Sequence, residues 1–384
     1  MRKILKVKAD IWLLIGLYLL VSPLYFDIFS SAQFSPAINK LIWFGLVLVT
    51  WAMTFLLTEI LTRTSEKSLP DIPNELSPHR RPKPRGGGLS FVLIFLIISG
   101  VVATKFWPLY FPFFDFYFQY PILNFALLGF VKDFYKNNKK NVPTSSFYLL
   151  QGMTVLLSMP FSTLPLYFLN SSGSYIIGIA LGEIVWFILH ILFVVTFIKF
   201  YEFMDGLDGL VGSTSLIQLV FLSLYFDHPV FILLSVSLLG FLQWNWSPAK
   251  IFMGAVGSNF LGAVIAIFLM AGPNSYMHIK SYPDPFLFWS AIAVTFPLMG
   301  DATYTIIRRF IRRENIFKAH RSHLYQRLQQ SGWPHSRVVL TYCAMTGVIA
   351  NLVFQLDLLG SMISVVITIL GIVAGEIYLK NAHS

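Results

Sequence analysis

Apolar runs of roughly twenty residues recur along this chain and are separated by short polar segments. A helix that crosses the hydrocarbon core of a bilayer needs roughly 20 predominantly apolar residues. Such runs predict membrane helices centred near residues 19, 50, 96, 124, 158, 190, 219, 236, 264, 295, 346 and 369. Because several runs are short, the pattern predicts an all-α, polytopic membrane protein of ten to twelve transmembrane helices, with residues 1–384 forming a single integral membrane domain.

The amino-acid composition is that of a protein embedded in a lipid bilayer. Of the 384 residues, 56% are hydrophobic, 12% are charged and 37 are Phe, which does not fit a water-facing surface. The first apolar run, residues 11–29, is too long for the h-region of a secretion signal and lacks a small-residue cleavage pattern after it. We therefore expect it to be a retained helix.

Lysine and arginine predict the orientation, because they accumulate in cytoplasmic loops. With the N-terminus inside, 25 of the 28 basic residues fall on the cytoplasmic side, and only Lys40, Lys105 and Lys280 fall outside. This partition requires an even number of crossings, hence twelve, with both termini inside. The expected cytoplasmic loops are residues 63–88, 132–147, 199–212, 244–257 and 305–337.

Net charge and cysteine content restrict the partners. The net charge of +10 is concentrated on the cytoplasmic face by this orientation. The basic residues there either set the topology alone or also attract anionic lipid and phosphate substrates. No nucleic-acid-binding motif is present in the sequence. The single cysteine, Cys343, excludes both a disulfide framework and a thiolate metal site.

The first two loops carry candidate chemistry. Arg85 precedes three glycines and an apolar helix, and backbone N–H groups at such a helix start suit a phosphate, although a flexible basic hinge is an equal alternative. Asp133 ends an apolar run, where a carboxylate is costly unless it has a metal, a proton or a partner. A capped loop start is the simpler explanation for Asp133.

The third loop contains two acids, Asp205 and Asp208, whose spacing of three places them on one side of a helical turn. The neighbouring glycines let the backbone approach a ligand closely. The segment superficially resembles half a calcium loop, but a third acid and a closing Glu are missing. The fourth loop also turns through glycines into a helix and carries no acid.

The fifth loop is the longest and the most basic, and Asp301 precedes it. His320, His323 and Arg327 recur at spacings of three and four, which predicts one helical face with two imidazoles and a guanidinium. Such a face can hold a diphosphate. As a zinc site, the two His residues would need a third protein ligand, and none is evident.

In this order the loops resemble the polyprenyl-phosphate N-acetylhexosamine-1-phosphate transferase family, the glycosyltransferase group 4 membrane enzymes. The matching motifs are Pro-Lys-Pro-Arg-Gly-Gly-Gly-Leu (82–89), Phe-Met-Asp-Gly-Leu-Asp-Gly-Leu (203–210), Pro-Ala-Lys-Ile-Phe-Met-Gly (248–254), Val-Gly-Ser (256–258), Asp-Ala-Thr-Tyr-Thr (301–305) and His-Arg-Ser-His-Leu-Tyr-Gln-Arg-Leu (320–328). The form of the last motif resembles the branch that starts O-antigen and related lipopolysaccharide glycans.

The resemblance implies transfer of a sugar-1-phosphate from a UDP-N-acetylhexosamine to undecaprenyl phosphate, with release of UMP and use of Mg2+. It implies a multi-pass protein of the bacterial inner membrane with the active-site loops in the cytoplasm. A homodimer is a further expectation for this chain. The implied catalytic residues are Asp133, Asp205 and Asp208, and the implied substrate-binding residues are Arg85, Gly86, Gly87, His320, Arg321, His323 and Arg327.

Four positions depart from the family pattern. Lys132 replaces the first of two paired acids, and Ala255 replaces the acid that resembles the magnesium ligand. Lys199 and Glu202 replace two asparagines, and Glu202 is expected to pair with Lys199 or with Lys132. Since two unit charges about 4 Å apart interact by about 4 kcal/mol at an effective dielectric near 20, the added lysines oppose a divalent cation.

Four interpretations remain open from the sequence. The leading one is a transferase scaffold that is inactive or severely impaired. In a second, Asp205, Asp208, Asp133 or Glu202 rebuilds a metal site in a shifted geometry. A third is a non-catalytic protein that binds polyprenyl phosphate or a nucleotide sugar and assists glycan assembly. A transporter or flippase ranks last, because motif loops on one side do not form a midplane site.

The basic-residue partition makes the orientation testable by single-cysteine labelling in a Cys343→Ser background. Lys83→Cys and Asn315→Cys should react with an impermeant thiol reagent only after the cells are permeabilised, because both positions are predicted to be cytoplasmic. Lys280→Cys is the matched control and should react in intact cells. Labelling of position 83 or 315 from outside intact cells would refute the orientation.

Overall fold

A computed structural model describes residues 36–73, 81–106, 112–137, 144–158, 176–228, 230–277, 286–315 and 320–382. Within them the chain is helical, as the apolar pattern predicts. The helices are α2 (Pro36–Ser68), α3 (Gly88–Phe106), α4 (Pro112–Asn137), α5 (Thr144–Ser158), α6 (Ile176–Met204), α7 (Leu210–Tyr225), α8 (Val230–Asn245), α9 (Gly254–Met277), α10 (Leu287–Ala291), the 3-10 helix η3 (Ile292–Thr295), α11 (Phe296–Ile311), α12 (Leu324–Gln330) and α13 (His335–Ala382).

One small antiparallel hairpin interrupts the helical pattern. Strands β1 (Pro70–Asp71) and β2 (Lys83–Pro84) pair with Pro70 opposite Pro84. The backbone N–H of Arg85 also donates to the carbonyl of Leu69, at 3.0 Å. The hairpin therefore holds the first motif loop against the end of α2.

Three helical stretches in the described part of the chain are long and apolar enough to cross a membrane: Leu41–Glu66, Leu287–Ile311 and His335–Ala382. The last contains a kink at Asp357, where φ is 46°, so this 48-residue element covers the two predicted centres at 346 and 369. The centre near residue 19 lies outside the described residues. The helical membrane architecture is thus supported, and the number of crossings stays a prediction.

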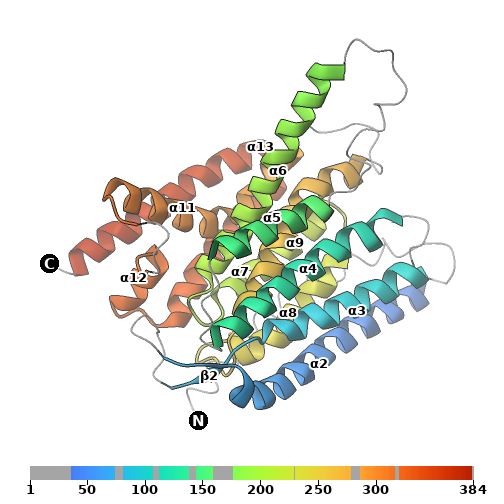
Figure 1. Cartoon of the computed structure of the whole chain (residues 1–384), viewed down its shortest axis with the longest axis horizontal. Helices are drawn as coiled ribbons and strands as arrows, with labels where there is room; N and C mark the ends of the chain where they lie inside the picture. The colour runs from blue at the N-terminus through green and yellow to red at the C-terminus, as the bar shows by residue number, and fades with distance from the viewer. Residues whose placement is uncertain are drawn as a thin grey trace.

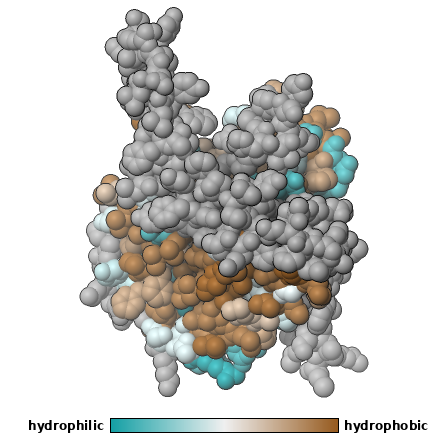
Figure 2. Space-filling model, turned by 90° about the vertical axis from the view of Figure 1, so that its right-hand side faces the viewer, coloured by the Kyte–Doolittle hydropathy of each residue, from teal (hydrophilic) through white to brown (hydrophobic). Residues whose placement is uncertain are grey.

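The middle of the bundle is formed by helices that are apolar on every side. All but two residues of α8 are buried, as expected for a helix without a polar face. It packs on α2, α3 and α7, while α9 packs on α4 and α6. By contrast α2 and α13 expose large apolar side chains, and Figure 2 shows a broad hydrophobic band across the visible face above a hydrophilic end.

Two glycines allow α3 and α4 to approach the start of α9. A Cβ added at Gly88 would lie 2.5 Å from the Cα of Gly257, and one added at Gly129 would lie 2.3 Å from the carbonyl oxygen of Ala255. Any larger residue would force these helices apart. The contacts bring the first, second and fourth motif loops together, at the end of the bundle where Figure 1 shows β2.

Candidate active site

Three of the four positions that depart from the family pattern form one ion-pair cluster. Lys132 of α4 and Lys199 of α6 both donate to the carboxylate of Glu202, and the Lys199 Nζ lies 3.1 Å from Oε2. The sequence predicted pairing of Glu202 with one lysine or the other, and the structure has both. Lys199 is buried, so this carboxylate neutralises charge where water is scarce.

Asp133 has the partners that its position at a helix end demands. Its Oδ2 accepts the backbone N–H of Val256 at 3.2 Å, and its Oδ1 lies 3.5 Å from Nε of Arg85. The same guanidinium lies 3.7 Å from Oδ1 of Asp71. A bound metal is therefore not needed to explain a buried carboxylate at position 133.

Ala255 lies in the first turn of α9, one residue before the N–H that Asp133 accepts, and is 9% exposed. The preceding residue, Gly254, has a φ of 77°, and a Cβ there would meet Oδ2 of Asp133 at 2.5 Å. Ala255, the position expected to supply a metal ligand, thus lies directly beside Asp133. It carries only a methyl group.

Asp205 and Asp208 occupy a non-helical turn, residues 205–209, that links α6 to α7, so the predicted helical turn is wrong. Gly209 has a φ of 79°, and a Cβ on Gly206 would lie 2.1 Å from the hydroxyl of Tyr325. The two glycines therefore provide a left-handed residue and a close contact with α12. Sequence spacing alone does not reveal that Gly206 must leave room for Tyr325 of α12.

The pKa values of the two acids in this turn are shifted in opposite directions. Burial raises the pKa of Asp205 well above its usual range, and the nearby acids Asp133, Glu202 and Asp208 add to this against the opposing Arg85. For Asp208, burial alone would raise the pKa, but His335, the N–H of Ala249 and Lys83 outweigh it and lower the pKa. Asp208 is therefore ionised at neutral pH, whereas its neighbour Asp205 has a raised pKa.

Two of the three glycines after Arg85 do not offer free N–H groups to a phosphate, so the prediction is wrong for Gly87 and Gly88. The N–H groups of Gly87 and Gly88 donate to the carbonyls of Phe252 and Met253, each at 2.9 Å. Gly86 supplies a φ of 87°. The glycine run thus joins the first loop to the fourth, and Arg85 is its candidate ligand-binding group.

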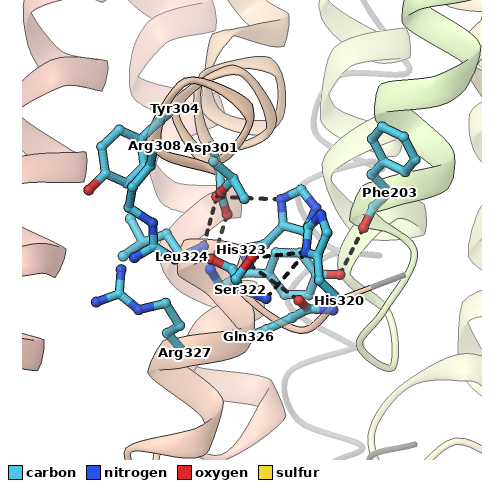
Figure 3. A network of polar contacts seen from close by, with 12 residues as sticks. Phe203, Asp301, Tyr304, Arg308, His320, Ser322, His323, Leu324, Gln326 and Arg327 are labelled. Carbon is cyan, nitrogen blue, oxygen red and sulfur yellow. Dashed lines mark hydrogen bonds and ion pairs between the residues drawn. The ribbon is translucent and has the colours of Figure 1, made fainter. Parts of the chain in front are cut away.

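The predicted helical face of His320, His323 and Arg327 is also wrong. Helix α12 begins at Leu324, so both histidines precede it, although their rings stay 5.0 Å apart. Figure 3 shows Arg308 and Arg327 on one side of Asp301 and His320 on the other. Arg321 points elsewhere, with its Nη2 at 3.3 Å from Oε1 of Gln329.

The two imidazoles are neutral at neutral pH. Burial lowers the pKa of His320 to about 4, and the nearby charges of Arg309 and Arg308 add to this effect. Burial also lowers the pKa of His323, against the opposing charge of Asp301. The positive charge of this loop therefore comes from its arginines, and the histidines can contribute hydrogen bonds only.

Asp301 holds the start of α12 in place (Figure 3). Its carboxylate accepts the backbone N–H groups of Leu324 and Tyr325 at 2.8 and 3.0 Å, the hydroxyl of Tyr342 at 2.6 Å and that of Thr305 at 3.1 Å. Tyr325 in turn donates to the carbonyl of Phe203 at 2.9 Å. An acid inside an apolar run is the sequence signal for this role.

Three of the carboxylates at this site, Glu202, Asp133 and Asp208, already have cationic or backbone partners, which disfavours their use as ligands of a divalent cation. Glu202 is shared by two lysines, Asp133 faces Arg85 and a backbone N–H, and Asp208 accepts an N–H and lies 3.9 Å from Nζ of Lys83. Among the described residues, no three His, Cys, Asp or Glu side chains group as metal ligands. Magnesium sites instead use one or two carboxylates with substrate phosphates.

These features define a helical membrane protein with a charged site at one end of its bundle. Residues 116–272 match the family described as glycosyl transferase family 4. The resemblance predicted from the motifs is confirmed over that part of the chain.

Curated relatives agree with this assignment. A decaprenyl-phosphate N-acetylglucosaminephosphotransferase of Mycobacterium leprae is 37% identical over 31% of this chain and 31% of its own length. A probable undecaprenyl-phosphate N-acetylglucosaminyl 1-phosphate transferase of Bacillus subtilis is 38% identical over 27% of each chain. A phospho-N-acetylmuramoyl-pentapeptide-transferase of Deinococcus radiodurans is 30% identical over 36% of this chain and 41% of its own. Each match thus spans well under half of the relative.

The structure predicts that Asp301→Ala destabilises the protein by roughly 3 kcal/mol or more, because two N–H groups and two hydroxyls lose a charged acceptor in a buried place. Thermal unfolding of the full chain in detergent micelles measures the loss. Thr305→Val is the control, since it removes one of the four donors and should cost about 1 kcal/mol. Equal stability of the two variants would contradict the role of Asp301.

Proposed function

We propose that this protein gathers undecaprenyl phosphate and a UDP-N-acetylhexosamine at the cytoplasmic face of a bacterial inner membrane, with severely impaired sugar-1-phosphate transfer. The names of the relatives and the family match support the substrate classes. The pairing of Glu202, Asp133 and Asp208 with cations or backbone donors carries the second half of the proposal. The form of the fifth loop supports a place in lipopolysaccharide or O-antigen assembly.

Phosphoryl transfer depends on positioning and charge stabilisation more than on covalent chemistry by the protein. The phosphates of both substrates must be neutralised and held in line, away from water. Here Arg85 and the arginines of the fifth loop can still attract phosphate. The additional cations, Lys132 and Lys199, are bound to Glu202 in an internal salt bridge. The position expected to supply the metal ligand, Ala255, carries only a methyl group.

A non-catalytic binding role is the second candidate, and the same ion pairs favour it. A site whose buried charges are paired internally stays folded without metal, and it can retain one substrate without consuming it. Such a protein would assist glycan assembly by presenting the lipid phosphate or the nucleotide sugar to another enzyme.

The proposal predicts negligible release of UMP from UDP-GlcNAc, undecaprenyl phosphate and Mg2+ by the unmodified chain. Lys132→Asp together with Ala255→Asp should raise release by roughly 100-fold, since charge stabilisation of this kind is typically worth that factor or more. Neither substitution alone should suffice. Adding Lys199→Asn and Glu202→Asn should increase the rate further, and the readout is UMP in membranes with and without Mg2+.

The control pairs Ala255→Asp with Lys250→Asp. Lys250 stacks on Trp244, with Nζ 4.5 Å from the ring centre, so this control makes the same charge change away from the ion-pair cluster. It should remain inactive. Robust magnesium-dependent release by the unmodified chain would overturn the proposal and would point to Asp133, Asp205 or Asp208 as substitute ligands.

A further inference from the structure

The carboxylate of Glu376 in α13 contacts three side chains from two other helices, α11 and α12. It accepts hydrogen bonds from both Nη atoms of Arg327 in α12, and from the hydroxyl of Tyr304 in α11 at 2.7 Å. Arg308 of α11 adds an ion pair at 3.6 Å. Two guanidiniums and a phenol thus converge on one carboxylate, which lies outside the motifs that the sequence singled out.

This group carries unbalanced positive charge. Arg308 and Arg327 share a single carboxylate, and Arg308 also donates to the carbonyl of Ser322 at 2.8 Å. The nearby Arg309 is neutralised separately by Glu314, at 2.9 Å. One positive charge therefore remains at the Arg308–Arg327 pair when Glu376 is in place, and two remain if Glu376 moves away.

The group lies at the boundary between polar and apolar surface. Tyr304, Ile307, Arg308 and Ile311 are spaced to share one face of α11. On that face Ile307 is 51% and Ile311 is 73% exposed. On α13, Ile377 follows Glu376 directly and is 56% exposed. An anion that is attached to an apolar chain could therefore contact both kinds of surface.

We propose that Arg308, Arg327 and Tyr304 form a binding site for a phosphate ester, and that Glu376 is the internal counter-ion that this ligand displaces. Guanidinium forks bind carboxylate and phosphate with the same two-bond geometry. A phosphate ester dianion carries more charge than a carboxylate, so it gains more from two guanidiniums. This inference rests on the proposed function and deepens it, because it names Glu376 as the group that the phosphate ester must displace. It requires neither turnover nor a metal.

The test measures dissociation constants of UMP and of farnesyl phosphate for the full chain in detergent micelles by calorimetry. Glu376→Gln should tighten binding of either probe by about tenfold. In the unmodified chain the Glu376 carboxylate occupies the two arginines, and the affinity for a competing ligand falls in proportion to the fraction of molecules in which the arginines are open. Arg308→Gln and Arg327→Gln should each weaken binding by about tenfold or more, the loss of a charged hydrogen bond. Tightening with UMP alone identifies a nucleotide phosphate, and tightening with farnesyl phosphate alone identifies a lipid phosphate.

Glu314→Gln is the matched control, because it removes one negative charge from the same loop. Arg309 stays held by the carbonyl of Asn315, at 2.7 Å, so this variant should change either affinity by less than about twofold. Equal effects of Glu376→Gln and Glu314→Gln, or no detectable binding of either probe to any variant, would overturn the proposal. If Glu376→Gln does not fold, Glu376→Asp should give intermediate tightening, and unchanged affinity there would count against the site.

Discussion

Neutralisation of charge at the end of an apolar bundle is the constraint on which this site depends. Carboxylates and ammonium groups that lose water need partners within hydrogen-bond reach. Glu202 meets that need for Lys132 and Lys199, Arg85 meets it for Asp133, and Asp301 is satisfied by donors that start α12. The loops are held together by these pairs and by backbone bonds, so the architecture needs no bound ion to persist.

The same constraint divides the site into two electrostatic regions. In the first region Glu202 pairs with Lys132 and Lys199, Asp133 lies beside Arg85 and Asp208 beside Lys83, whereas Arg308 and Arg327 in the second region share one carboxylate, Glu376. An incoming phosphate is therefore favoured at the second region. Tyr325 joins the two by contacting Phe203 and Gly206, which makes α12 the physical connection between them.

The helices and part of the charged site could be predicted from the sequence. The predictions that were wrong share one cause. Apolar runs predicted the helices, and charge with spacing predicted that Glu202 would meet Lys132 or Lys199. The free glycine N–H groups and the histidine face were wrong because partners distant in sequence decide both. Phe252 and Met253 accept the glycine N–H groups, and Asp301 starts α12 after the histidines. Glu376 was missed because α13 reaches the site only through tertiary packing.

The central claim is that internal ion pairs replace the divalent ion, and Mn2+ binding followed by electron paramagnetic resonance tests it without any need for turnover. The unmodified full chain in detergent micelles should leave Mn2+ in its free form, and the Lys132→Asp, Ala255→Asp variant should bind about one ion per chain, since magnesium-type sites need one or two carboxylates. One Mn2+ bound per unmodified chain, and lost in Glu202→Gln, would contradict the account.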